Sequence, residues 1–176
     1  MTSTTAPAAA TTDERADLLD ALTTHRWFLT STVQGLTDEQ ARLRPTASEL
    51  TLGGLVKHVA ATERTWAEFV VAGPSAFPAV DESTAADWAA EFVMGPAETL
   101  AGLLAQYAEV AARTDELVRT LPSLDASHPL PEAPWFTPGA TRSARRVFLH
   151  VIAETAQHAG HADILRETID GQKTMG

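Results

Sequence analysis

Three histidines and a glutamate recur at helical spacing near the C-terminal end of the chain. The stretch from Leu149 to Glu167 reads LHVIAETAQHAGHADILRE, and its ionisable groups on this spacing are His150, Glu154, His158 and His161. At about 100° per residue, all four fall within one narrow arc of a helix. Apolar residues share that arc, so we expect the four side chains to face the protein interior. A carboxylate buried without a partner is costly, and Glu154 therefore needs hydrogen bonds, a cation or a metal ion.

A divalent metal ion is one way to satisfy this helix face. Glu154 and His158 are one turn apart, which lets both side chains reach the same ion. His150 and His161 are separated by about 16 Å along the axis, at about 1.5 Å per residue, so one ion cannot bind all four groups. A metal site would therefore need a further ligand from another helix.

Two histidines elsewhere in the chain are candidates for that ligand. His58 lies mid-helix on an apolar stripe and is the first candidate, and His25 shares the apolar face of the first predicted helix and is the second. A single inward histidine is, however, more often a core residue satisfied by one hydrogen bond than a ligand. Spacing alone leaves two interpretations open: a metal site, or a buried pair of Glu154 and His158 without a metal.

The composition excludes several classes of function. The chain has 176 residues, a formal net charge of −10 and no cysteine. The negative charge would repel nucleic acid, and without cysteine any thiol chemistry must use an external thiol. No apolar run approaches the roughly 20 residues needed to cross a bilayer, so we expect no membrane insertion. The N-terminus lacks the features of a secretion signal, and we therefore expect a cytoplasmic protein.

Apolar residues recur every three or four positions along most of the chain, which predicts an all-α protein without strands. Residues 1–12 are predicted to be a disordered polar tail, and residues 13–176 a single four-helix bundle domain. A capping box at Thr37–Gln40 predicts a short helix, and a brief helix is expected around Ala85–Phe92. Leu121–Ala140 contains five prolines and is predicted to be a loop. The long helices are expected at Asp13–Gln34, Thr51–Ala72, Pro96–Thr120 and Thr141–Ile169.

Two motifs resemble the DinB-like (YfiT-like) metalloprotein superfamily. They are Leu55-Val-Lys-His58 on an early predicted helix and Glu154-Thr-Ala-Gln-His158-Ala-Gly-His161 on the last. The resemblance covers nearly all of the chain after the tail, including GLTDEQARLRPTASELTLGGLVKHVAATERTW. It implies a four-helix bundle with up-down-down-up connections and a divalent metal ion held by three side chains, with zinc as the expected metal and nickel as the alternative.

Carried over position by position, the resemblance implies that His58, Glu154 and His158 are the metal ligands. Many relatives use three histidines, and the glutamate resembles the variant found in mycothiol-dependent maleylpyruvate isomerase. His161 falls where many relatives have glutamine, which leaves open whether it binds the metal or supports a ligand.

The resemblance also implies a chemistry, in which a low-molecular-weight thiol such as mycothiol is transferred or added to an electrophilic small molecule. Two imidazoles and a carboxylate around an ion leave a coordination position open, and a thiol or water bound there loses its proton more readily. His161, His150 and His25 are candidate proton carriers or supports for the ligands, and Arg142, Arg145 and Arg146 are candidate binders of an anionic substrate or cofactor. Core polarity explains these histidines equally well, and such arginines are more often solvated or paired.

Two other functions stay open at this point. One is a bundle that binds a metal or a small ligand without turnover, and the other is a metal-dependent hydrolase. Aromatic residues in predicted loops, Trp88 and Trp135, are compatible with a homodimer.

Overall fold

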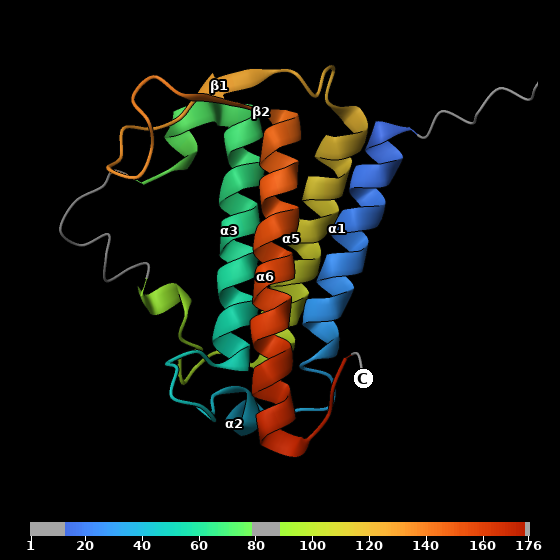
Figure 1. Ribbon diagram of the computed structural model, residues 1–176, viewed down its shortest axis with the longest axis vertical. Helices are drawn as coiled ribbons and strands as arrows, with labels where there is room; N and C mark the ends of the chain where they lie inside the picture. The colour runs from blue at the N-terminus through green and yellow to red at the C-terminus, as the bar shows by residue number, and fades with distance from the viewer. Residues whose placement is uncertain (1–12, 79–88, 175–176) are drawn as a thin grey trace, which may run out of the picture.

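Long helices dominate the part of the chain that the structure, a computed structural model, describes, which is residues 13–78 and 89–174 (Figure 1). The long helices are α1 (Glu14–Ser31), α3 (Leu52–Ala72), α5 (Leu100–Thr120) and α6 (Ala144–Asp170). Shorter elements are α2 (Asp38–Ala41), the 3-10 helix η1 (Gly73–Ala76), β1 (Ser127–Pro129) and β2 (Thr141–Ser143). Among the described helices, none combines the length and the apolar character that a membrane span requires.

The four long helices are connected in up-down-down-up order, as expected. In Figure 1 the chain descends along α1, ascends along α3 and again along α5, and descends along α6. The parallel pair α3 and α5 needs a long crossover, which runs through residues 73–99. Part of the brief helix expected around Ala85–Phe92 lies outside the described residues, and residues 89–91 are helical. The prediction of an all-α bundle is therefore confirmed at the level of fold class.

Capping residues define where the helices begin and end. The Thr37 side chain accepts a hydrogen bond from the Gln40 backbone, and the Gln40 side chain accepts one from the Thr37 backbone, so the capping box is present. Thr51 caps α3 by accepting from the Gly54 amide. Gly171, with a φ of 78°, adopts the left-handed conformation that ends α6.

Two predicted helix starts were too early. The third long helix begins at Leu100 and not at Pro96, because the Thr99 side chain accepts from the Gly102 amide and caps the helix there. The last helix begins at Ala144, because residues 141–143 pair with β1 as an antiparallel strand. β1 lies within the predicted loop Leu121–Ala140, and β2 directly follows it. The sequence predicted no strands, because two strands of three residues are too short to show an alternating pattern.

The core contains a buried ion pair between apolar layers. Arg26 on α1 donates hydrogen bonds to Glu63 on α3, at 2.5 and 3.2 Å, and one of 2.7 Å to Asp115 on α5. Apolar clusters pack on both sides of it, one containing Leu29, Leu55, Leu103 and Leu165, and the other Leu22, Phe69, Val118 and Phe148. The core thus ties α1, α3 and α5 together with both apolar and ionic contacts.

Candidate metal centre

The side chains of His58, Glu154 and His158 meet between α3 and α6. Each offers one ligand atom, and these atoms all lie within 4.8 Å of one another. The Oε2 atom of Glu154 lies 3.7 Å from Nε2 of His158, and the rings of His58 and His158 meet edge to face with centroids 4.9 Å apart. The three side chains are 16, 29 and 12% exposed, respectively. The structure thus brings the three expected ligands together.

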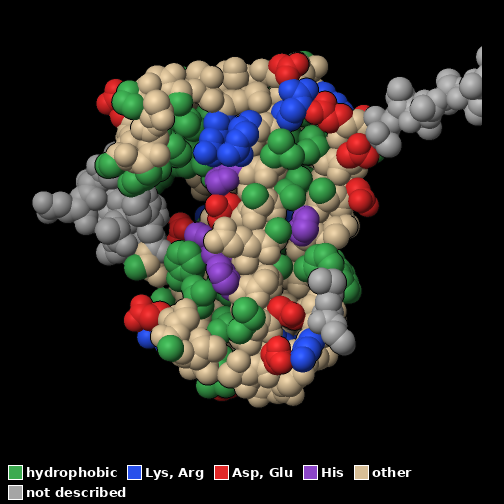
Figure 2. All heavy atoms as spheres, in the orientation of Figure 1, with side chains coloured by type: hydrophobic (Ala, Val, Ile, Leu, Met, Phe, Trp, Pro, Cys, Tyr) green, Lys and Arg blue, Asp and Glu red, His purple; other side chains and the backbone are tan. Residues whose placement is uncertain are grey.

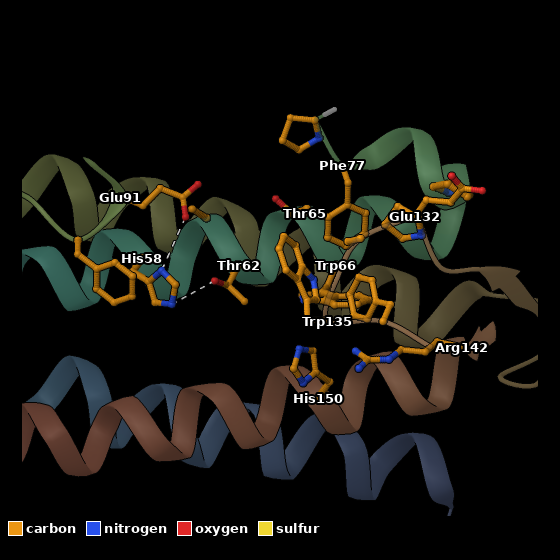
Figure 3. A pocket seen from close by; sticks show the side chains of 17 residues that line it. His58, Thr62, Thr65, Trp66, Phe77, Glu91, Glu132, Trp135, Arg142 and His150 are labelled. Atoms are coloured by element: carbon orange, nitrogen blue, oxygen red, sulfur yellow. Dashed lines mark hydrogen bonds and ion pairs between the residues drawn. The ribbon is translucent and has the colours of Figure 1, made fainter. Parts of the chain in front are cut away.

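His58 is held in place from α3 and from the crossover. Its Nε2 lies 3.5 Å from the Thr62 hydroxyl, and its ring stacks on Phe92 with centroids 3.8 Å apart. Figure 3 shows Glu91 on the other side of the ring, with its carboxylate 3.7 Å from Nδ1. This Nδ1 is buried and makes no hydrogen bond with any residue that the structure describes. A buried ring nitrogen without a hydrogen bond is suited to a ligand that the protein alone does not supply.

His158 is kept neutral by its surroundings. Burial, and then the charges of His58 and His161, lower the pKa of His158 to about 4. A metal-binding imidazole must be unprotonated, so at neutral pH this ring needs no proton loss before it binds an ion. The Nδ1 atom of His161 lies 3.4 Å from Nδ1 of His158, which leaves Nε2 of His158 facing Glu154. The donor set of two imidazoles and one carboxylate fits a divalent transition metal.

Glu154 lies between two histidines of its own helix. Its Oε1 is 3.8 Å from Nε2 of His150, one turn before it, and Oε2 faces His158, one turn after it. The His150 ring also meets Trp66 edge to face at 4.8 Å. Burial, and then the charges of Arg142 and Arg146, lower the pKa of His150 to about 4. The helix face predicted from spacing therefore does point inward.

A cavity of about 770 Å³ is lined by His58, one of the three clustered residues. In Figure 3 His58 and Glu91 lie at one end and Arg142 toward the other, with Trp66, Trp135 and His150 between them. Figure 2 shows histidine side chains gathered at a hollow on this face, next to a group of Lys and Arg side chains. The volume is within the range of small-molecule sites, and the walls are mostly apolar.

The two arginines suggested as ligand binders have different positions. Arg142 lines the cavity, with its guanidinium 4.5 Å above the Trp66 ring. Arg145 forms ion pairs with Glu14 and Asp125 and is not among the residues that line the cavity. The structure therefore brings Arg142 to the site and places Arg145 in an ionic contact between α6, α1 and the loop after α5.

Of the other candidate residues, some lie at the site and some do not. His161 contacts His158, whereas His25 lies half-buried on α1 with its ring 6.1 Å from Phe28 and does not belong to the three-residue cluster or the cavity lining. Trp135 is 54% exposed and lines the cavity, and Trp88 lies outside the described residues. The homodimer stays a prediction.

Several residues of the site were missed in the sequence. Thr62 and Trp66 follow His58 at intervals of four on α3, so helical spacing was a signal for both. Glu91 and Phe92 reach the site from the crossover, and no sequence spacing connects them to α3. Their position depends on how the crossover folds back.

The four long helices form a bundle in which His58, Glu154 and His158 could together hold a metal ion. The sequence matches the model of the mycothiol-S-transferase family over residues 17–171, and the chain belongs to this family of DinB-like, metal-dependent and mycothiol-related enzymes.

The fold is similar to that of a solved structure. It is described as the crystal structure of a conserved protein from Enterococcus faecalis, and it is 15% identical, with a TM-score of 0.64. The match covers 92% of this chain and 100% of that one, and at this identity it concerns the fold alone. A search among curated proteins found no significant match.

Proposed function

We propose that this protein is a divalent-metal-dependent transferase that joins the sulfur of a mycothiol-like thiol to an electrophilic small molecule. The observation that carries the proposal is the cluster of His58, Glu154 and His158, of which His58 lines a mostly apolar cavity of about 770 Å³. Membership of the mycothiol-S-transferase family supports the choice of thiol. The absence of cysteine means that the sulfur must come from outside the chain.

His58, Glu154 and His158 would hold the ion, for which zinc is the first candidate and nickel the second. When bound, the ion would lower the pKa of a thiol and so supply a thiolate near neutral pH. Phe92 and Thr62 contact His58 and would fix its ring, and His161 would do the same for His158. His25 is too remote from these contacts to be assigned a role.

The transfer requires a proton to leave the thiol. The S–H bond breaks and the sulfur forms a bond to the electrophilic carbon, where either the bond to a leaving group or one bond of a double bond breaks. The proton passes to the displaced leaving group, to the atom that receives the electron pair of the double bond, or to water. His150 lines the cavity and lies 3.8 Å from Glu154, so we assign proton relay to it.

The test is a thiol-consumption assay with zinc-loaded protein, mycothiol and 1-chloro-2,4-dinitrobenzene as electrophile. We expect conjugate formation that saturates with thiol, and its loss in His58→Ala but not in the control His25→Ala. Product that forms without thiol would identify a hydrolase instead. Metal and thiol binding without any conjugate would identify a binding protein and would contradict the proposal.

A further inference from the structure

Arg142 has an unusual environment at the cavity end opposite His58. It sits in β2, just before α6 begins, and its guanidinium lies 4.5 Å from the Trp66 ring centre and 5.6 Å from that of Phe136. Cations over aromatic faces are held by the ring quadrupole. Because the rings cover the guanidinium's surface, its polar N–H groups are the part left to bind a ligand.

Arg142 is partly buried, and unlike the buried Arg26 and Arg166 it forms no ion pair with any residue that the structure describes. Arg26 binds Glu63 and Asp115, and Arg166 binds Asp170. In contrast, Nη1 of Arg142 is buried and has no hydrogen-bond partner among the residues that the structure describes. A buried donor without a partner costs free energy, which a bound acceptor would recover.

The charges around Arg142 are mixed. Burial and the charge of Arg146 lower the pKa of Arg142, while Glu154 acts in the opposite direction. An arginine stays protonated in proteins even under such influences, so the cavity contains a fixed positive charge at this end. A guanidinium matches the two oxygens of a carboxylate and can bind them through parallel hydrogen bonds.

We infer that Arg142 recognises a carboxylate on the electrophilic substrate, and that the substrate class is an organic acid with a flat, apolar body. The aromatic walls between Arg142 and His58, formed by Trp66, Phe77 and Phe136, suit such a body (Figure 3). With the carboxylate at Arg142, the rest of the molecule extends toward the His58 end, where the proposed function places the sulfur. This inference rests on the proposed transferase function, to which it adds the class of electrophilic substrate.

A carboxylate could instead belong to the thiol. The sulfur, however, is needed at the cluster of His58, Glu154 and His158, and Arg142 lines the other end of the cavity (Figure 3). The geometry therefore favours the electrophile, and the experiment separates the two sources.

The first arm measures equilibrium binding of two unreactive probes, 4-phenylbutyrate and 4-phenylbutanamide, to the full-length protein as purified, by calorimetry. We expect the wild type to prefer the carboxylate by about tenfold or more, the contrast expected for a charge-assisted hydrogen bond. Arg142→Gln should lose this preference while still binding the amide, and Arg142→Lys should keep part of it. Arg146→Gln, which removes a neighbouring exposed charge, is the matched control and should retain the preference.

Circular dichroism and thermal melting show whether each variant is folded. If Arg142→Gln does not fold, the comparison of the wild type with Arg142→Lys still tests the inference. Equal binding of the two probes to the wild type, or no binding of 4-phenylbutyrate, would overturn the inference. So would an equal loss of acid and amide in Arg142→Gln, which would mean that Arg142 only shapes the wall. If Arg146→Gln lost the preference for the carboxylate as fully as Arg142→Gln, the preference would come from the positive charge of the region and not from Arg142, and the inference would be overturned.

The second arm compares N-acetylcysteine with its amide, a thiol pair that differs only in the carboxylate. A preference confined to this pair would assign Arg142 to the thiol and overturn the inference. Neither arm needs a metal ion or turnover, so the two proposals can fail separately. If the probe preference is present but no thiol is consumed, the transferase proposal fails while Arg142 stands as an organic-acid site.

Discussion

The imidazole rings of His58 and His158 meet edge to face, with their centroids 4.9 Å apart, although they belong to different helices. The contact exists because α3 and α6 run side by side in opposite directions (Figure 1). Glu154 completes the cluster from one turn earlier on α6. Two helices are therefore enough to assemble the whole donor set, and any variant that separates them should affect the site.

His161 is expected to position a ligand and not to be one. Because its Nδ1 lies 3.4 Å from Nδ1 of His158, His161→Ala should free the His158 ring without removing a ligand. We expect zinc affinity to fall by about 10- to 100-fold, with one ion still bound at saturation. Competition with a chromophoric chelator measures both quantities. His25→Ala should leave both the affinity and the number of bound ions unchanged. If His161→Ala bound less than one zinc ion per chain at saturation, His161 would be a ligand.

The buried ion pair of the core should be costly to break. Glu63 is fully buried and binds Arg26, so Glu63→Gln leaves the guanidinium without its main counter-charge. We expect the free energy of unfolding in urea to fall by about 3–5 kcal/mol. The exposed pair of Glu68 and Arg113 is the control, and Glu68→Gln should change stability by no more than about 1 kcal/mol. Equal effects of the two variants would contradict this view of the core.

The apolar core can be tested apart from the site. Leu103 on α5 is 4% exposed, and Leu103→Ala should lower the free energy of unfolding by about 2–5 kcal/mol because it leaves a cavity. Leu149, 48% exposed on α6, is the control, and Leu149→Ala should cost no more than about 0.5 kcal/mol. Metal content after refolding should be the same in both. A metal loss in Leu103→Ala would show that packing at α5 controls the site.

Metal-free protein should become less stable as the pH falls from about 6.5 to about 4. His150 and His158 have pKa values of about 4 in the folded state, below the value of about 6.5 expected when unfolded. Within this window the unfolded chain takes up protons that the folded chain does not, which favours unfolding; above it these two groups contribute no pH dependence. Urea unfolding in the presence of a chelator measures the trend, and His150→Gln should have a shallower dependence. An identical slope would contradict the assignment for His150.

The sequence was sufficient to predict the four long helices, apart from the starts of α5 and α6, and one face of the site. Caps at Thr37, Thr51 and Gly171, together with apolar spacing, mark the elements, because both signals act within a few residues. The inward arc of α6 is likewise a local property. The apolar stripe made His58 the first candidate for a third ligand and His25 the second, and the family resemblance then pointed to His58.

What the sequence did not reveal depends on contacts between distant segments. Arg26 is a charged residue on an apolar face, and its burial is understandable only when Glu63 from α3 is opposite it. The short strands form because β1 and β2 pair with each other, and the helix start at Ala144 follows from that pairing. Glu91 and Phe92 reach His58 only through the fold of the crossover. Such relationships leave no periodic trace in the chain.

The most direct test of the account is elemental analysis by mass spectrometry of protein purified without a metal-affinity tag. We predict about one divalent transition metal ion per chain in the wild type, lost in His158→Ala and weakened in Glu154→Gln, with both variants still folded. His25→Ala should retain the ion. A wild type that stays free of metal after incubation with excess zinc, or a His158→Ala variant with unchanged metal content, would contradict the central claim that His58, Glu154 and His158 form a metal centre.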